Sequence, residues 1–131
     1  MTPEERTAFI QKPRTAVLST TGADGHTHAV PVWYRYTDGA FRIITARDSV
    51  KVRNVAANPP ASLCMDDREG RFAWVTAEGP VEVACEVTKE ERLALHTHYR
   101  GAEAAQKIVD AGGHEGMVLL ILTPERWLPS R

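Results

Sequence analysis

The sequence lacks the features that would assign it to a membrane, to nucleic acid or to a disulfide-stabilised class. Its 131 residues contain no apolar run close to the roughly 20 residues that a membrane-spanning helix requires. The formal net charge is −1, so no overall positive field attracts nucleic acid or an anionic membrane surface. We therefore expect partners other than nucleic acid and membranes.

Cysteine is also scarce. The two cysteines, Cys64 and Cys85, lie in expected strands and lack the C-x-x-C spacing of many metal and redox sites. Residues 1–14 are charged and helical in character, without the apolar segment of a secretory signal. These features predict a cytoplasmic protein whose thiols stay reduced. The length favours a single domain over residues 1–131.

The sequence has none of the common catalytic motifs. It contains no G-x-S-x-G, P-loop, H-E-x-x-H or G-x-G-x-x-G. His26 and His28 are two residues apart on one expected strand face, but no third metal ligand lies nearby in the sequence. We therefore expect no metal site, and an enzyme with this sequence would rely on a bound cofactor for its chemistry.

The pattern of apolar residues and turns predicts a mainly β domain. Expected strands cover residues 14–20, 26–36, 41–45, 61–65, 72–85 and 117–123, and expected helices cover 2–11, 49–58, 88–99 and 102–111. Tight turns join most consecutive strands, which indicates antiparallel pairing. The sequence thus predicts six strands in a small antiparallel barrel, with short helices at its ends or sides.

Cations and a hydroxyl gather where the third strand meets a helix. Arg47, Ser49, Lys51 and Arg53 follow a strand that ends at Thr45. A helix N-terminus presents free N–H groups and a partial positive charge, which suit a phosphate. Lys51 and Arg53 do not share a helix face, so Lys51 is the better candidate to reach an anion. The alternative is a solvated helix with a serine cap.

Other residues are open to two interpretations. Trp33 and Tyr34 are neighbours in an expected strand and face opposite ways, so at most one lines a given pocket. Val50 and Val55 are expected to face the core from the helix after residue 48. His114, in a glycine-rich loop, is a candidate pocket lid.

The order of these elements resembles a known family. The chain is similar to the pyridoxamine-phosphate-oxidase-like superfamily of split β-barrel flavoproteins, and within it to small flavin/deazaflavin oxidoreductases of the F420-dependent type. The segments that carry the resemblance are residues 16–20, 24–28, 30–34, 44–45, 49–54, 61–65 and 75–81.

The resemblance implies a six-stranded antiparallel split β-barrel that forms a homodimer, with cofactor sites at the subunit interface. The strand containing Val30, Pro31, Val32 and Trp33 would lie along the cofactor ring, and Ile44 and Thr45 would approach the ribityl chain. Ser49 and Lys51, with Arg47 or Arg53, would hold the phosphate, and Val50 lies within this segment. Trp74 or Trp127 of the partner subunit would close the site.

The resemblance also bears on the cofactor. Flavin-bound oxidases of this superfamily carry an arginine where this chain has Val30, which favours F420 over FMN. The expected activity is hydride transfer between C5 of the deazaflavin and a planar conjugated small molecule. Two alternatives stay open: an FMN-dependent oxidoreductase or oxidase, and a non-catalytic cofactor or haem binding module with His26, His28 or His114 as haem ligands.

Overall fold

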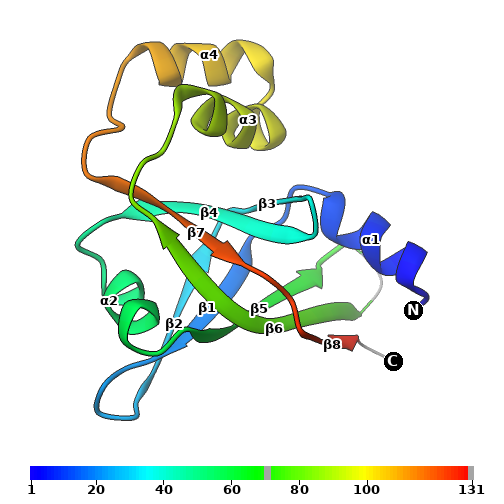
Figure 1. Ribbon diagram of the computed structural model, residues 1–131. Helices are drawn as coiled ribbons and strands as arrows, with labels where there is room; N and C mark the ends of the chain where they lie inside the picture. Colours follow the sequence, from blue (N-terminus) through cyan, green and yellow to red (C-terminus); the bar gives the residue numbers. More distant parts are fainter. Residues whose placement is uncertain (70–71, 130–131) are drawn as a thin grey trace.

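The computed structural model describes residues 1–69 and 72–129, which form a mainly β domain with four peripheral helices (Figure 1). In chain order the elements are α1 (Pro3–Gln11), β1 (Ala16–Thr21), β2 (Thr27–Val32), β3 (Arg35–Thr37), β4 (Ala40–Ala46), α2 (Val50–Ala57), β5 (Pro60–Asp67), β6 (Ala73–Ala84), α3 (Lys89–Arg100), α4 (Ala102–Asp110), β7 (Met117–Leu122) and β8 (Arg126–Pro129). No helix in the described ranges is long and apolar enough to cross a membrane.

All strand pairs are antiparallel, and the spatial order is β2-β1-β5-β6-β7-β4-β3, with β8 also paired to β6. The sheet curls around one core, and β2 and β3 form its two ends. The inward side chains are apolar, and the largest of those almost completely buried are Tyr34, Phe41, Ile10, Leu18, Ile43, Leu63, Met65, Leu120 and Leu122. The predicted antiparallel barrel with peripheral helices is confirmed.

The strand count differs from the expected six, because the structure has eight strands in its described part. The expected strand over residues 26–36 is interrupted between β2 and β3. There the Tyr34 N–H donates to the hydroxyl of Tyr99 at 3.0 Å, and the Tyr34 hydroxyl donates to the Ile10 carbonyl at 3.0 Å. The other additional strand, β8, follows the Pro124 turn and pairs with the first half of β6.

The long strand β6 belongs to both halves of the barrel. Up to Pro80 it pairs with β5, and from Val81 it pairs with β7. The chain crosses itself closely here, because a Cβ placed on Gly79 would lie 1.9 Å from the Thr123 carbonyl oxygen. Only glycine, which has no Cβ, fits this crossing.

Helices α3 and α4 form a hairpin on the outer side of β4 and β7 (Figure 1). The Glu91 carboxylate accepts hydrogen bonds from Arg42 on β4 at 3.0 and 2.8 Å and from Arg35 on β3 at 3.3 Å. Thr88 caps α3 by accepting from the Glu91 N–H at 3.1 Å. The Glu91 side chain bonds to these arginines and not to the Thr88 backbone N–H, and the contacts fix the hairpin to the barrel.

Candidate functional site

The turn between β4 and α2 is held by backbone hydrogen bonds. The Arg47 N–H donates to the Gly116 carbonyl at 2.7 Å, and the Ser49 N–H donates to the Ala46 carbonyl at 3.1 Å. The Arg47 guanidinium donates to the Cys85 carbonyl at 3.2 Å. These bonds place the start of α2 beside the ends of β4, β6 and the loop before β7.

Ser49 is the N-cap residue of α2, as the sequence predicts, but its side chain does not cap the helix. Its Oγ atom is buried and has no hydrogen-bond partner among the described residues. A hydroxyl at a serine N-cap normally accepts from a backbone N–H of the first turn. At α2 the Ser49 hydroxyl and the first-turn N–H groups can therefore still form hydrogen bonds with a ligand.

Lys51 lies in the first turn of α2 and is half-buried. Burial lowers the pKa of its ammonium group below the usual value. No carboxylate within residues 1–69 and 72–129 forms an ion pair with it. A partly desolvated cation without a counter-charge is stabilised when an anion binds beside it. By contrast, Arg53 is exposed to solvent.

The inward face of α2 differs in one residue from the expectation. Val52 and Val55 are buried, whereas Val50 is 39% exposed, so the prediction that Val50 faces the core is wrong. The helix begins at Val50 and contacts β1 and β6 through the face that carries Val52 and Val55. Asn54 faces β1, where its Nδ2 donates to the Thr20 hydroxyl at 3.0 Å.

The residues predicted to contact the cofactor ring lie on two faces of β2. Val30 and Val32 are half-buried and pair with Leu18 and Ala16, which are completely buried. Pro31 is exposed on the opposite face. The side chains of Val30 and Val32 can therefore contact a ligand at the inner edge of β2, but the Pro31 side chain cannot contact the same ligand face.

Trp33 lies beyond the end of β2 and packs on α3. Its indole stacks on the Tyr99 ring with centroids 4.3 Å apart and planes 7° apart. The Arg100 guanidinium lies 4.9 Å from the indole centroid. These contacts join the β2–β3 junction to α3.

The remaining predicted residues also divide between faces. Thr45 is buried, whereas its neighbour Ile44 is half-buried on the face of β4 that carries Arg42. Trp74 lies on the outer face of β6, 36% exposed, with its ring edge-to-face with Phe72 at 5.7 Å. Thr45, Ser49 and Lys51 thus lie along the end of β4 and the start of α2, whereas Trp74 lies on a different surface.

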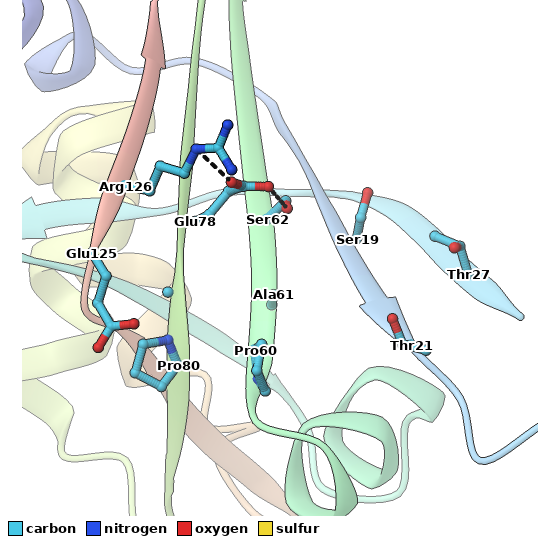
Figure 2. A pocket seen from close by; sticks show the side chains of 11 residues that line it. Ser19, Thr21, Thr27, Pro60, Ala61, Ser62, Glu78, Pro80, Glu125 and Arg126 are labelled. Carbon is cyan, nitrogen blue, oxygen red and sulfur yellow. Dashed lines mark hydrogen bonds and ion pairs between the residues drawn. The ribbon is translucent and has the colours of Figure 1, made fainter. Parts of the chain in front are cut away.

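A hollow on the outer face of β1, β5 and β6 was not found by sequence reasoning (Figure 2). Its volume is about 590 Å³, and its residues are Ser19, Thr21, Thr27, Pro60, Ala61, Ser62, Glu78, Gly79, Pro80, Glu125 and Arg126. The Glu78 carboxylate accepts from Ser62 at 3.2 Å and lies 3.6 Å from Arg126. The alternation of small polar residues along β1 and β5 is the signal that could have indicated this face.

The histidines occupy different environments. His26 lies in the turn before β2, exposed, with its Nδ1 2.8 Å from Asp24. His28 points inward from β2, and its Nδ1 is buried without a hydrogen-bond partner among the described residues. His114 is exposed in the loop before β7. Within the described ranges no three histidine, cysteine or acidic side chains are grouped closely enough to hold a metal ion.

Comparisons with known proteins find one matching sequence family and several solved structures with a similar fold. A family model described as pyridoxamine 5'-phosphate oxidase matches residues 2–130. No curated protein matches the chain.

Three solved structures illustrate the similarity in fold. A conserved hypothetical protein from Mycobacterium tuberculosis has 24% identity and a TM-score of 0.85, covering 98% of this chain and 84% of that one. An F420 reductase has 21% identity and a TM-score of 0.79, covering 97% and 98%. HutZ, the haem storage protein from Vibrio cholerae, has 17% identity and a TM-score of 0.73, covering 96% and 92%. These likenesses confirm the split-barrel fold.

Proposed function

Because the chain belongs to the pyridoxamine 5'-phosphate oxidase family, we propose that it is a cofactor-dependent oxidoreductase whose cofactor phosphate binds at the start of α2. The observation that carries this proposal is Lys51, a half-buried cation whose pKa is lowered by burial and which has no carboxylate partner in the described ranges. Beside it lies the unpartnered hydroxyl of Ser49. An anion held by the first turn of α2 would use both groups.

We propose F420 as the cofactor, with FMN as the alternative. Val30 is half-buried opposite Leu18, so its surroundings suit an apolar contact with a ring better than a second cation for the phosphate. Similarity in fold to an F420 reductase supports the same choice.

Either cofactor would supply hydride transfer to or from a planar conjugated small molecule when bound. The protein's residues would bind and orient. Lys51, Ser49 and the first-turn N–H groups of α2 would fix the phosphate, while Val30 and Val32 would exclude water from one edge of the ring. In the described part of the chain β2 pairs only with β1, so its other edge has backbone N–H groups free to contact the ring.

We also propose a homodimer in which the outer face of β1, β5, β6 and β8 is covered by a second copy. Val17, Trp74 and Leu128 on this face are 43%, 36% and 37% exposed, an apolar surface that a partner would bury. Trp74 would then lie near the partner's cofactor. The test is sedimentation of the wild type and of Val17→Glu: we expect a dimer that the variant weakens. A stable wild-type monomer with full cofactor affinity would contradict the shared site.

The experiment that tests the function is a parallel titration of the cofactor-free protein with F420 and with FMN, followed by fluorescence. Tighter binding of F420 would support a deazaflavin reductase and direct screening toward conjugated acceptors. Tighter binding of FMN would place the protein with flavin-dependent enzymes. Binding of neither would overturn the proposal and favour the haem module, to be tested by haem absorption in variants of His28 and His114.

A further inference from the structure

The hydroxyl of Tyr99, from helix α3, lies between two neighbouring strands where their pairing ends. The β1–β2 ladder ends at the pair of Ala16 and Val32, and the same register, continued past this pair, places Arg14 opposite Tyr34. The Tyr34 N–H donates instead to the Tyr99 hydroxyl at 3.0 Å, and this hydroxyl donates to the Arg14 carbonyl at 2.6 Å. The Tyr99 side chain therefore occupies the place of a backbone hydrogen bond.

This inserted hydroxyl separates β2 from β1. A direct ladder bond joins nitrogen and oxygen at about 2.9 Å, whereas here two bonds in series join the Tyr34 nitrogen to the Arg14 oxygen. At this point the chain leaves the ladder: β2 ends at Val32, and β3 begins at Arg35. Burial raises the pKa of the Tyr99 phenol, so the hydroxyl keeps the proton that it donates.

The ring of Tyr99 also holds Trp33, the residue that directly follows β2. The two rings are stacked with centroids 4.3 Å apart and planes 7° apart, and the Arg100 guanidinium lies 4.9 Å from the indole centroid. Trp33 belongs to no strand, so helix α3 sets its position and not the sheet ladder. Helix α3 is itself fixed to the barrel at its other end, where Glu91 accepts hydrogen bonds from β4.

We propose that Tyr99 is a positioning residue for the cofactor ring, which sets where β2 separates from β1 and where the Trp33 indole closes the end of the ring site. This inference rests on the proposed function. Tyr99 acts through Trp33 and the Tyr34 backbone and does not itself touch the cofactor. A site whose contacts are held in place before the ligand arrives binds more tightly, because less freedom is lost on binding. Removing the hydroxyl should therefore weaken binding of the ring and leave binding of the phosphate unchanged.

The test compares FMN with riboflavin, which lacks the phosphate, in wild type, Tyr99→Phe and Tyr36→Phe. Tyr99→Phe keeps the aromatic ring and removes only the hydroxyl. We expect its affinity for both ligands to fall by about tenfold, with the preference for FMN over riboflavin as in wild type. Tyr36→Phe is the matched control and should behave as wild type, because the Tyr36 side chain is half-buried on β3 and its hydroxyl makes no hydrogen bond with a described residue.

Two further readouts separate positioning from a loss of stability. The visible absorption spectrum of bound riboflavin should differ between Tyr99→Phe and wild type, since it reports the surroundings of the ring. In wild type, exchange of the Tyr34 amide with deuterium should slow when riboflavin binds, and this measurement needs no variant to fold. If F420 is the tighter ligand, F420 and its deazaflavin portion without the phosphate replace FMN and riboflavin.

The outcomes separate this inference from the proposed function. If the wild type binds neither FMN nor F420, the proposed function fails and the inference fails with it. If a cofactor binds and Tyr99→Phe shows the affinity and spectrum of wild type, Tyr99 has no positioning role while the function stands. An equal loss in Tyr36→Phe, a lower preference for FMN at unchanged riboflavin affinity, or unchanged exchange of the Tyr34 amide would overturn the inference in the same way.

Discussion

Arg42, which contacts helix α3, and Lys51, which lies in helix α2, are both half-buried cations, but their surroundings differ. Arg42 donates two short hydrogen bonds to Glu91, and these raise its pKa. Lys51 has no such partner in the described residues, and burial lowers its pKa. The first cation fixes a helical hairpin to the barrel. The second is held at some cost, because a desolvated charge without a partner destabilises the fold.

We interpret this difference as one between a structural charge, Arg42, and a proposed binding charge, Lys51. A cation that serves the fold should matter to stability and not to ligand affinity, whereas a cation that serves a ligand should show the reverse. Four predictions test this division.

The largest expected effect is at the structural pair. Glu91→Ala removes the carboxylate from both Arg42 and Arg35 and should lower the free energy of unfolding by about 2 kcal/mol, the scale of charge-assisted hydrogen bonds. Urea denaturation measures it. Glu90→Ala is the matched control, an exposed acid in the same helical turn, and should change stability by less than about 0.5 kcal/mol. Equal losses in both variants would show that the helix terminus, not the arginine pairing, is responsible.

The next effect concerns ligand binding. Lys51→Ala should weaken cofactor binding by about 1–3 kcal/mol, the range for a hydrogen bond to a charged group. The melting temperature without cofactor should not fall, because no partner in the described ranges loses a bond and an unpaired, partly desolvated charge is removed. Fluorescence titration and thermal denaturation measure the two quantities. Unchanged cofactor affinity would remove Lys51 from the site.

A smaller effect is expected in the pH dependence of stability. Burial lowers the pKa of Lys51 in the folded protein below its usual value of 10.5, so the unfolded chain keeps this proton to higher pH. Stability of the cofactor-free protein should therefore gain a contribution as the pH rises from that lowered pKa toward 10.5. Lys51→Met should remove this contribution. Urea unfolding across the alkaline range compares the two proteins, and parallel profiles would contradict the inferred burial of the charge.

The smallest effect is expected at Arg53. It is exposed and does not share the helix face of Lys51, so Arg53→Ala should change cofactor affinity by less than about 0.5 kcal/mol. The same fluorescence titration measures it. A loss as large as that of Lys51→Ala would mean that the phosphate lies outside the first turn of α2.

Local signals in the sequence predicted much of the fold. The expected helix over residues 2–11 is present as α1, and Thr2 and Glu5 cap its start through reciprocal bonds of 2.8 and 3.0 Å. The beginning of α2 close to residue 49 was also predicted. These features depend on a few residues that are close in the chain, so a single sequence is enough to predict them.

Long-range contacts account for most of what the sequence did not predict. The interruption between β2 and β3 involves Tyr99, 65 residues away from Tyr34. Likewise, the Glu91 carboxylate does not cap its own helix, because it accepts hydrogen bonds from Arg42, 49 residues earlier in the chain. Strand alternation alone puts Pro31 and Val32 on opposite faces. The strand register shows which of the two faces is the inner one. The role of the whole candidate site stays a prediction.

The continuous course of β6 has a consequence for how the molecule opens. The first half of β6 forms backbone hydrogen bonds with β5 and β8, and its second half forms them with β7. Neither half of the barrel can detach without breaking the ladder of this one strand. We expect β6 to contain the amides that exchange most slowly with deuterium, and the two halves to unfold as one cooperative unit, while the α3–α4 hairpin opens at lower free energy.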